Sequence, residues 1–257
     1  MRQALRAEWT KTRTVTGPLR LLLGTVAATV ALSAGAASAV TCGSAGCGDM
    51  TRLSLTGVQL GQALVVILAV LVVAGEYGTG MIRTTLTAMP RRTTVLAAKA
   101  VTLTGIVAAA GAVAVLGSLA AGRLLLPGGA FTTTRGHPPL SLTDGPTLRA
   151  ALGSILYLAL IALLSLGIAT VVRDAAASAG TVLGLLYLVP VLSRMIGSPH
   201  WQRLLQRIGP MSAGLAVQAT TDIHSLPIGP WAGLGVTAGW AAATLLAGGL
   251  VLRIRDV

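Results

Sequence analysis

The sequence predicts an all-α integral membrane protein with six transmembrane helices and additional short amphipathic interfacial helices. Of its 257 residues, 54% are hydrophobic and only 10% charged, and the mean hydropathy is +0.80. Such a composition excludes an ordinary soluble domain. Six uncharged runs match the roughly 20 apolar residues that a helix needs to cross a bilayer, and they are too uniformly apolar for barrel strands. The runs are residues 21–40, 58–75, 100–122, 150–172, 175–192 and 231–252.

The distribution of basic residues predicts the orientation. With the N-terminus inside, the inner segments hold 12 of the 19 lysines and arginines and the outer segments hold 7. The inner segments are also shorter, so this is the positive-inside pattern, with N- and C-termini cytoplasmic. The net charge of +12 is therefore explained by contact with the lipid bilayer. Because the basic residues are dispersed and lack interleaved aromatic residues, a nucleic-acid partner is not expected.

The basic segment 1–18 precedes the first run and predicts a helix in the cytoplasmic headgroup layer. Leu5 and Trp9 share one face, and Glu8 and Lys11 have the spacing of an ion pair one turn apart. A Gly-Pro pair ends this helix. A frayed basic tail is the alternative for this segment. A cleavable signal peptide is disfavoured because both the basic start and the apolar run are too long.

Within the remaining transmembrane domain, residues 19–257, a polar loop at residues 76–94 joins the second and third runs. Thr79 can cap a short helix there, and Pro90 stops it. Its apolar face consists of Met81, Ile82, Leu86 and Met89, whereas Arg83, Thr84 and Thr87 point elsewhere. A methionine-bearing apolar face at the cytoplasmic surface suits docking of a partner. A tight loop carrying a positive-inside cluster explains the same pattern.

A second amphipathic helix is predicted outside the membrane, at residues 198–209. Ser198 and Pro199 are suited to its start and Gly209 to its end, and its apolar residues recur at helical spacing. The following segment, residues 211–230, is too interrupted to span the bilayer. A re-entrant piece enclosed by protein is one interpretation of it.

Cys42 and Cys47 lie just outside the first run, with four residues between them. They could close a small disulfide loop on an oxidising face, or remain two thiols in a Gly/Ser-rich loop. Two cysteines without a further ligand make a poor zinc site.

Motifs for catalysis or cofactor binding are absent from the sequence. There is no Walker lysine motif, no G-x-S-x-G elbow and no metal-binding histidine spacing. None of the six runs contains Asp, Glu, Lys, Arg or His, although ion-coupled carriers generally place such groups at membrane depth. The chain is therefore expected not to be an enzyme, and any ATP is expected to be bound by a partner.

Four segments resemble the permease subunit of ABC-2-type ABC transporters of the short kind common in actinobacteria. They are "LRAEWTKTRTV", "GEYGTGMIRTTLTAMPRRTTVLAAK", "VVRDAAASAGTVLGLLYLVP" and "WAGLGVTAGWAAATLLAGGLVLRIRDV". The resemblance covers nearly the whole chain except the outer loops. Asp174 departs from the pattern, since an uncharged residue is expected there, and this puts in doubt any contact made by that turn.

The resemblance implies a dimer of two permeases, either identical or different, in the bacterial cell membrane, driven by separate ATP-binding subunits. It implies that Thr79–Met89 form a coupling helix contacting the ATPase and that Glu76 holds this loop. The implied connecting helix contains Leu5, Arg6, Glu8, Trp9 and Lys11. The absence of a substrate-binding domain favours export, and the apolar spans favour a hydrophobic or amphipathic substrate. The alternatives are an autonomous secondary carrier or channel, and a membrane scaffold that moves no substrate.

Overall fold

The structure is a computed structural model, and it describes residues 10, 16–39, 49–78, 92–125 and 144–254. All regular elements in these ranges are helical. The α-helices are α2 (Thr16–Ala39), α3 (Met50–Ser54), α4 (Gly57–Gly78), α6 (Arg92–Leu125), α7 (Gly145–Val172), α8 (Ala175–Leu183), α9 (Val189–Met195), α10 (Pro199–Ile208), α11 (Pro210–Gly214) and α12 (Pro230–Ile254). A π-helix, η2 (Gly184–Leu188), joins α8 to α9, and two 3-10 helices, η3 (Leu215–Gln218) and η4 (Ile223–Ser225), follow α11.

Six stretches are long and apolar enough to cross a membrane, which confirms the all-α fold with six membrane-spanning helices. They are Leu19–Ala39, Met50–Gly78, Thr93–Leu125, Gly145–Val172, Ala175–Met195 and Pro230–Ile254. These stretches extend beyond most of the uncharged runs because a helix continues through the polar residues that flank its apolar part.

The first spanning helix begins earlier than the sequence pattern indicates. Residues 16–18 belong to α2, although the Gly-Pro pair was expected to end a separate helix before the first run. A proline is tolerated in the first turn of a helix because the backbone N–H groups there have no partner within the helix. The pair therefore lies inside the start of α2.

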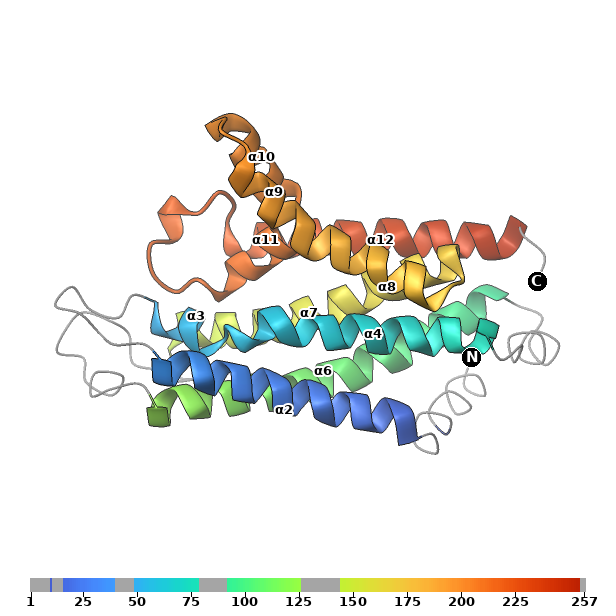
Figure 1. Ribbon diagram of the computed structural model, residues 1–257, viewed down its shortest axis with the longest axis horizontal. Helices are drawn as coiled ribbons and strands as arrows, with labels where there is room; N and C mark the ends of the chain where they lie inside the picture. Colours follow the sequence, from blue (N-terminus) through green and yellow to red (C-terminus); the bar gives the residue numbers. More distant parts are fainter. Residues whose placement is uncertain (1–9, 11–15, 40–48, 79–91, 126–143, 255–257) are drawn as a thin grey trace, which may run out of the picture.

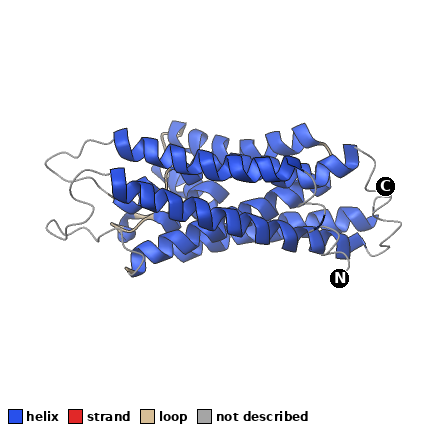
Figure 2. Cartoon of the chain, turned by 90° about the horizontal axis from the view of Figure 1, so that it is seen from below, coloured by secondary structure: helices blue, strands red, loops and turns tan. Residues whose placement is uncertain are grey.

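The spans run back and forth along one long axis (Figures 1 and 2). The first residues of α2 and the last of α12 lie at the same end of the bundle, which we call the termini end, and α3 lies at the opposite, far end. The spans containing α4 and α7 are central, since most of their residues are buried, whereas only a minority of the residues are buried in the other four. Which end faces the cytoplasm stays a prediction from the charge distribution.

Small residues allow the closest contacts between spans. A Cβ added at Gly57 would lie 2.0 Å from the backbone oxygen of Thr29, so α2 and α4 approach backbone to backbone. The Gly57 N–H donates a hydrogen bond to the Ser33 hydroxyl, at 3.1 Å, across the same contact. Such close approach is how helices associate inside a bilayer, where apolar side chains gain little by leaving lipid.

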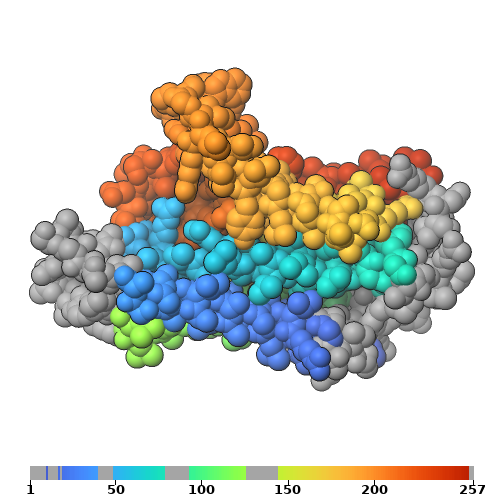
Figure 3. All heavy atoms as spheres, viewed as in Figure 1, coloured from blue at the N-terminus to red at the C-terminus, as the bar shows by residue number. Residues whose placement is uncertain are grey.

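The fifth span is interrupted halfway. Its π-helical turn, Gly184–Leu188, comes just before Pro190, which has no backbone N–H to donate and so disturbs the regular hydrogen bonding of the helix. Beyond α9 the chain turns into α10, which stands away from the bundle (Figure 3). The amphipathic helix predicted over 198–209 is present as Pro199–Ile208, between Ser198 and Gly209.

Candidate functional site

A buried ion pair joins α4 to α6 near the termini end. The Nζ of Lys99 donates to Oε1 of Glu76 at 2.6 Å, and each side chain is about 5% exposed or less. Glu76 lies near the end of α4, and Lys99 lies in the second turn of α6. An ion pair this deeply buried is held by mutual attraction in a medium of low dielectric constant, against the cost of removing both charges from water.

The pair lies inside the helices and not in the loop between them. The sequence places Lys99 just before the third uncharged run, and in the structure α6 begins at Arg92, so the candidate span Thr93–Leu125 includes Lys99. Glu76 likewise lies within the span Met50–Gly78. Two of the candidate spans therefore each contain a charged side chain that is buried against the other. The uncharged run ends where the first charge appears, whereas α6 extends through Lys99 to Arg92.

A third span contributes to the same end of the bundle. Arg173 follows the last residue of α7 in the left-handed conformation, with φ of 64°, and its N–H donates to Ala169 O at 2.9 Å. Its guanidinium lies over the ring of Tyr77, 5.4 Å from the ring centre. Glycine usually occupies this position after a helix, so the contact with Tyr77 is a gain that offsets a strained backbone.

Asp174, where the resemblance predicts an uncharged residue, has a local structural role. Its carboxylate accepts a hydrogen bond from the Ala177 N–H at 2.7 Å and so caps the N-terminus of α8. Aspartate is among the preferred residues at this position. The turn between α7 and α8 is therefore short and well defined, and it directs Arg173 toward Tyr77.

Together these contacts hold the ends of α4, α6 and α7 at the place where the chain leaves α4 and enters α6. Of these residues, Glu76 was predicted from the sequence to be part of the site. Lys99 and Arg173 were not predicted to lie near it. Lys99 is one of only two lysines in the chain, and the helical pattern of "TTVLAAK" could have extended α6 back to it.

The other predicted contact residues lie outside the described residues. They are Thr79, Met81, Ile82, Arg83, Leu86 and Met89 of the loop, Leu5, Arg6, Glu8, Trp9 and Lys11 of the N-terminal segment, and Cys42 and Cys47. Their predicted roles stay predictions.

At the far end, the irregular segment after α11 is folded into the bundle. All four residues of η3 are buried, including Gln218, whose Nε2 donates to the Ser154 hydroxyl at 3.0 Å. Asp49 accepts a hydrogen bond from the Thr220 hydroxyl at 2.7 Å, and Arg149 donates to Ala219 O at 2.7 Å. Side chains from other elements thus provide partners for the backbone of this segment, and its re-entrant position in a membrane stays a prediction.

A polar contact also lies in the middle of the bundle. The hydroxyl of Tyr157 on α7 donates to Oε1 of Gln62 on α4, and both side chains are fully buried. The hydroxyl of Tyr187, in the π-helical turn, donates to Gln59 O. These bonds tie the interrupted fifth span and the central α7 to α4.

Replacing Tyr157 by phenylalanine is expected to lower the free energy of unfolding by about 1–2 kcal/mol, because the Gln62 carbonyl loses its donor in an apolar interior. Unfolding in detergent, followed by circular dichroism, measures this. The double variant Tyr157→Phe/Gln62→Leu removes both polar groups and should recover much of the loss. If the loss of stability in the double variant equals the sum of the losses in the two single variants, the hydrogen bond between Tyr157 and Gln62 is contradicted.

Within the described part of the chain, no three His, Cys, Asp or Glu side chains are grouped to hold a metal ion. The candidate site consists of the helix ends around the Glu76–Lys99 pair, which connects α4 to α6. Comparison of the chain with protein-family models and with curated protein sequences gave no match. Six apolar helices and this arrangement fit a multi-pass membrane transport protein.

Proposed function

We propose that this chain is the membrane-spanning permease subunit of an ATP-driven ABC transporter of the ABC-2 type. It pairs with a second permease subunit and exports a hydrophobic or amphipathic substrate across a bacterial cell membrane. A separate ATP-binding subunit supplies the energy. The observation that carries this proposal is the Glu76–Lys99 ion pair, which connects the two helices on either side of the loop that resembles a coupling helix.

The ion pair supports the proposal for a mechanical reason. The loop between α4 and α6 is expected to dock on the ATPase, and its two flanking helices are fastened together only a few residues away. Movement of the loop then displaces α4 and α6 as one unit. The Arg173–Tyr77 contact extends the unit to α7, one of the two central spans. A partner can drive this displacement only if it binds two states of the permease with different affinity.

The apolar face of the loop gives the test of partner docking. The double variant Ile82→Glu/Leu86→Glu should lose more than about a hundredfold in affinity for the ATP-binding subunit, since about 3 kcal/mol of apolar burial disappears. The measurement is co-purification from native membranes in mild detergent, with quantitative mass spectrometry and ATPase assay. The matched control Thr84→Glu/Thr87→Glu adds the same charges on another face and should retain the partner.

Equal retention of an ATP-binding partner by both double variants would overturn the docking assignment. If no protein with a Walker lysine co-purifies with the unmodified chain, the ABC proposal itself fails.

An autonomous secondary carrier is the second candidate, and the buried polar groups of the bundle favour it. Besides the Glu76–Lys99 pair, Nε2 of Gln62 and Oε1 of Gln218 are buried with no hydrogen-bond partner among the described residues. Polar groups at membrane depth are costly and commonly serve transport. Substrate flux driven by an ion gradient in vesicles free of ATP would establish this function in place of the first.

A further inference from the structure

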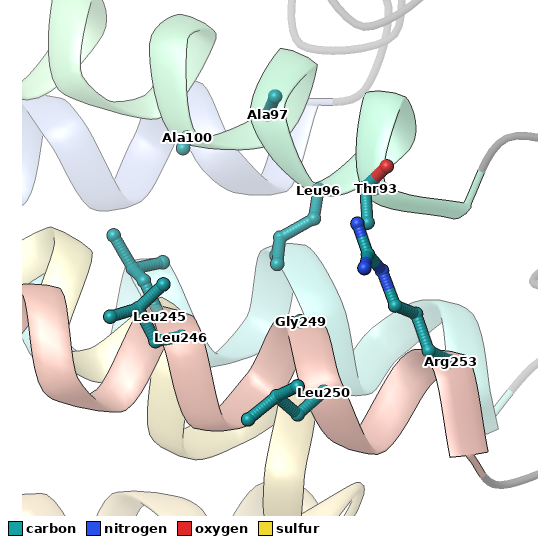
Figure 4. A pocket seen from close by; sticks show the side chains of 9 residues that line it. All are labelled: Thr93, Leu96, Ala97, Ala100, Leu245, Leu246, Gly249, Leu250 and Arg253. Atoms are coloured by element: carbon teal, nitrogen blue, oxygen red, sulfur yellow. The ribbon is translucent and has the colours of Figure 1, made fainter.

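A lateral groove lies between α6 and α12 near the termini end (Figure 4). Its volume is about 340 Å³, within the range of small-molecule sites. The lining is Thr93, Leu96, Ala97 and Ala100 from α6 and Leu245, Leu246, Gly249, Leu250 and Arg253 from α12. Gly249 forms part of the groove wall, because a Cβ there would meet only Leu96, at 3.9 Å.

The groove opens sideways, toward the surface that faces the membrane. Only a minority of the residues in the spans containing α6 and α12 are buried, and Leu246 and Leu250 are 69% and 57% exposed. In a bilayer, such leucines contact acyl chains and not water. A chain-like apolar molecule that follows the axis of α12 is therefore the shape that the groove accommodates.

The polar groups of the groove lie at one end of it. Arg253 is the second-last residue of α12, and its side chain extends toward Thr93 of α6. Gly249 and Leu246 lie about one and two helical turns deeper along α12. Arg253 therefore reaches the level of the lipid headgroups, above an apolar channel. Within the described residues, no carboxylate lies within salt-bridge distance of its guanidinium.

We propose that this groove is a binding site for one anionic phospholipid, with an acyl chain between α6 and α12 and the phosphate at Arg253. The charge at the mouth distinguishes this ligand from a zwitterionic lipid, because basic groups between spans attract anionic headgroups. It also disfavours a second copy of the chain, since the corresponding mouth of another copy carries the same positive charge. The site is independent of the proposed transport function.

The experiment counts lipids that stay bound to the full chain, by native mass spectrometry of protein released from nanodiscs. The nanodiscs contain equal amounts of phosphatidylglycerol and phosphatidylcholine. Arg253→Gln is expected to lower the preference for phosphatidylglycerol about fivefold, the effect of one basic residue at a membrane surface. Gly249→Leu fills the groove and should remove the bound lipid of either headgroup.

Two variants serve as matched controls. Arg20→Gln removes an exposed arginine from α2 near the termini end, and Gly239→Leu adds the same side chain to an exposed part of α12 where nothing lies within 4 Å of a Cβ. Both should bind lipid like the unmodified chain. If Arg20→Gln lowers the preference as much as Arg253→Gln, the attraction is a general surface effect and the proposal fails.

Two further results would also overturn the proposal. One is unchanged lipid binding in both Arg253→Gln and Gly249→Leu. The other is efficient disulfide cross-linking between two copies of a Leu246→Cys variant, with Cys42 and Cys47 replaced by serine, because the groove would then be covered by a second chain.

Discussion

Replacing Lys99 by methionine is expected to destabilise the protein by about 3–5 kcal/mol, a larger loss than that expected for Tyr157→Phe. The substitution keeps much of the volume of the side chain but removes the charge that Glu76 faces. The free energy of unfolding in detergent, measured by denaturant titration with circular dichroism, gives the loss directly.

The size of the effect follows from burial. Lys99 is 4% exposed and Glu76 is 4% exposed, so the carboxylate cannot regain water when the ammonium disappears. The bond of 2.6 Å places the charges in direct contact, where the interaction is strongest. Without the ammonium, the carboxylate loses a counter-charge in direct contact at a site where water cannot replace it, and this raises the free energy of the folded state.

The double variant Glu76→Gln/Lys99→Met separates the ion pair from the packing around it. Because both charges are removed, this variant should recover most of the stability, since a buried pair itself adds little net free energy. The matched control Arg20→Met removes an exposed cation near the same end and should change stability by less than about 0.5 kcal/mol. An equal loss in the single and double variants would show that the aliphatic part of Lys99, and not its charge, is what matters.

The fold was largely predictable because a bilayer imposes simple rules. The six spans follow from the length of the uncharged runs, and the helix around Trp201 follows from its apolar spacing. The third uncharged run begins at residue 100, whereas α6 begins at Arg92. A charge marks the limit of an uncharged run, but Lys99 lies inside the helix and pairs with Glu76, which lies 23 residues earlier in the chain.

The far end was less predictable because its contacts join distant parts of the chain. Asp49 and Thr220 are 171 residues apart, and Gln218 and Ser154 are 64 residues apart. No local pattern indicates such partners, so the segment after α11 could be recognised as too interrupted to span but not placed. The predicted roles of the loop after α4 and of the N-terminal segment rest on the sequence alone.

Replacing Gly167 by alanine is the second substitution expected to have a large effect on stability, and it tests the contact between α7 and α12. A Cβ at Gly167 would lie 2.5 Å from the backbone carbonyl carbon of Thr244 and 2.7 Å from the nitrogen of Leu245. Both are backbone atoms, which cannot rotate away as the end of a side chain does. The two helices must therefore separate, and the expected loss in the free energy of unfolding is about 1–3 kcal/mol.

Gly105→Ala on α6 is the matched control for Gly167→Ala. Gly105 is exposed within a span, and a Cβ added to it would have no atom within 4 Å. Alanine favours the helix over glycine by up to about 1 kcal/mol, so Gly105→Ala should be neutral or stabilising. Alanine brings the same gain in helix propensity at Gly167. The free-energy cost of the steric overlap there must therefore exceed that gain if the variant is to be destabilised. If Gly167→Ala is as stable as Gly105→Ala, α7 and α12 are not in backbone contact at this point, and the closest packing of the central span lies elsewhere.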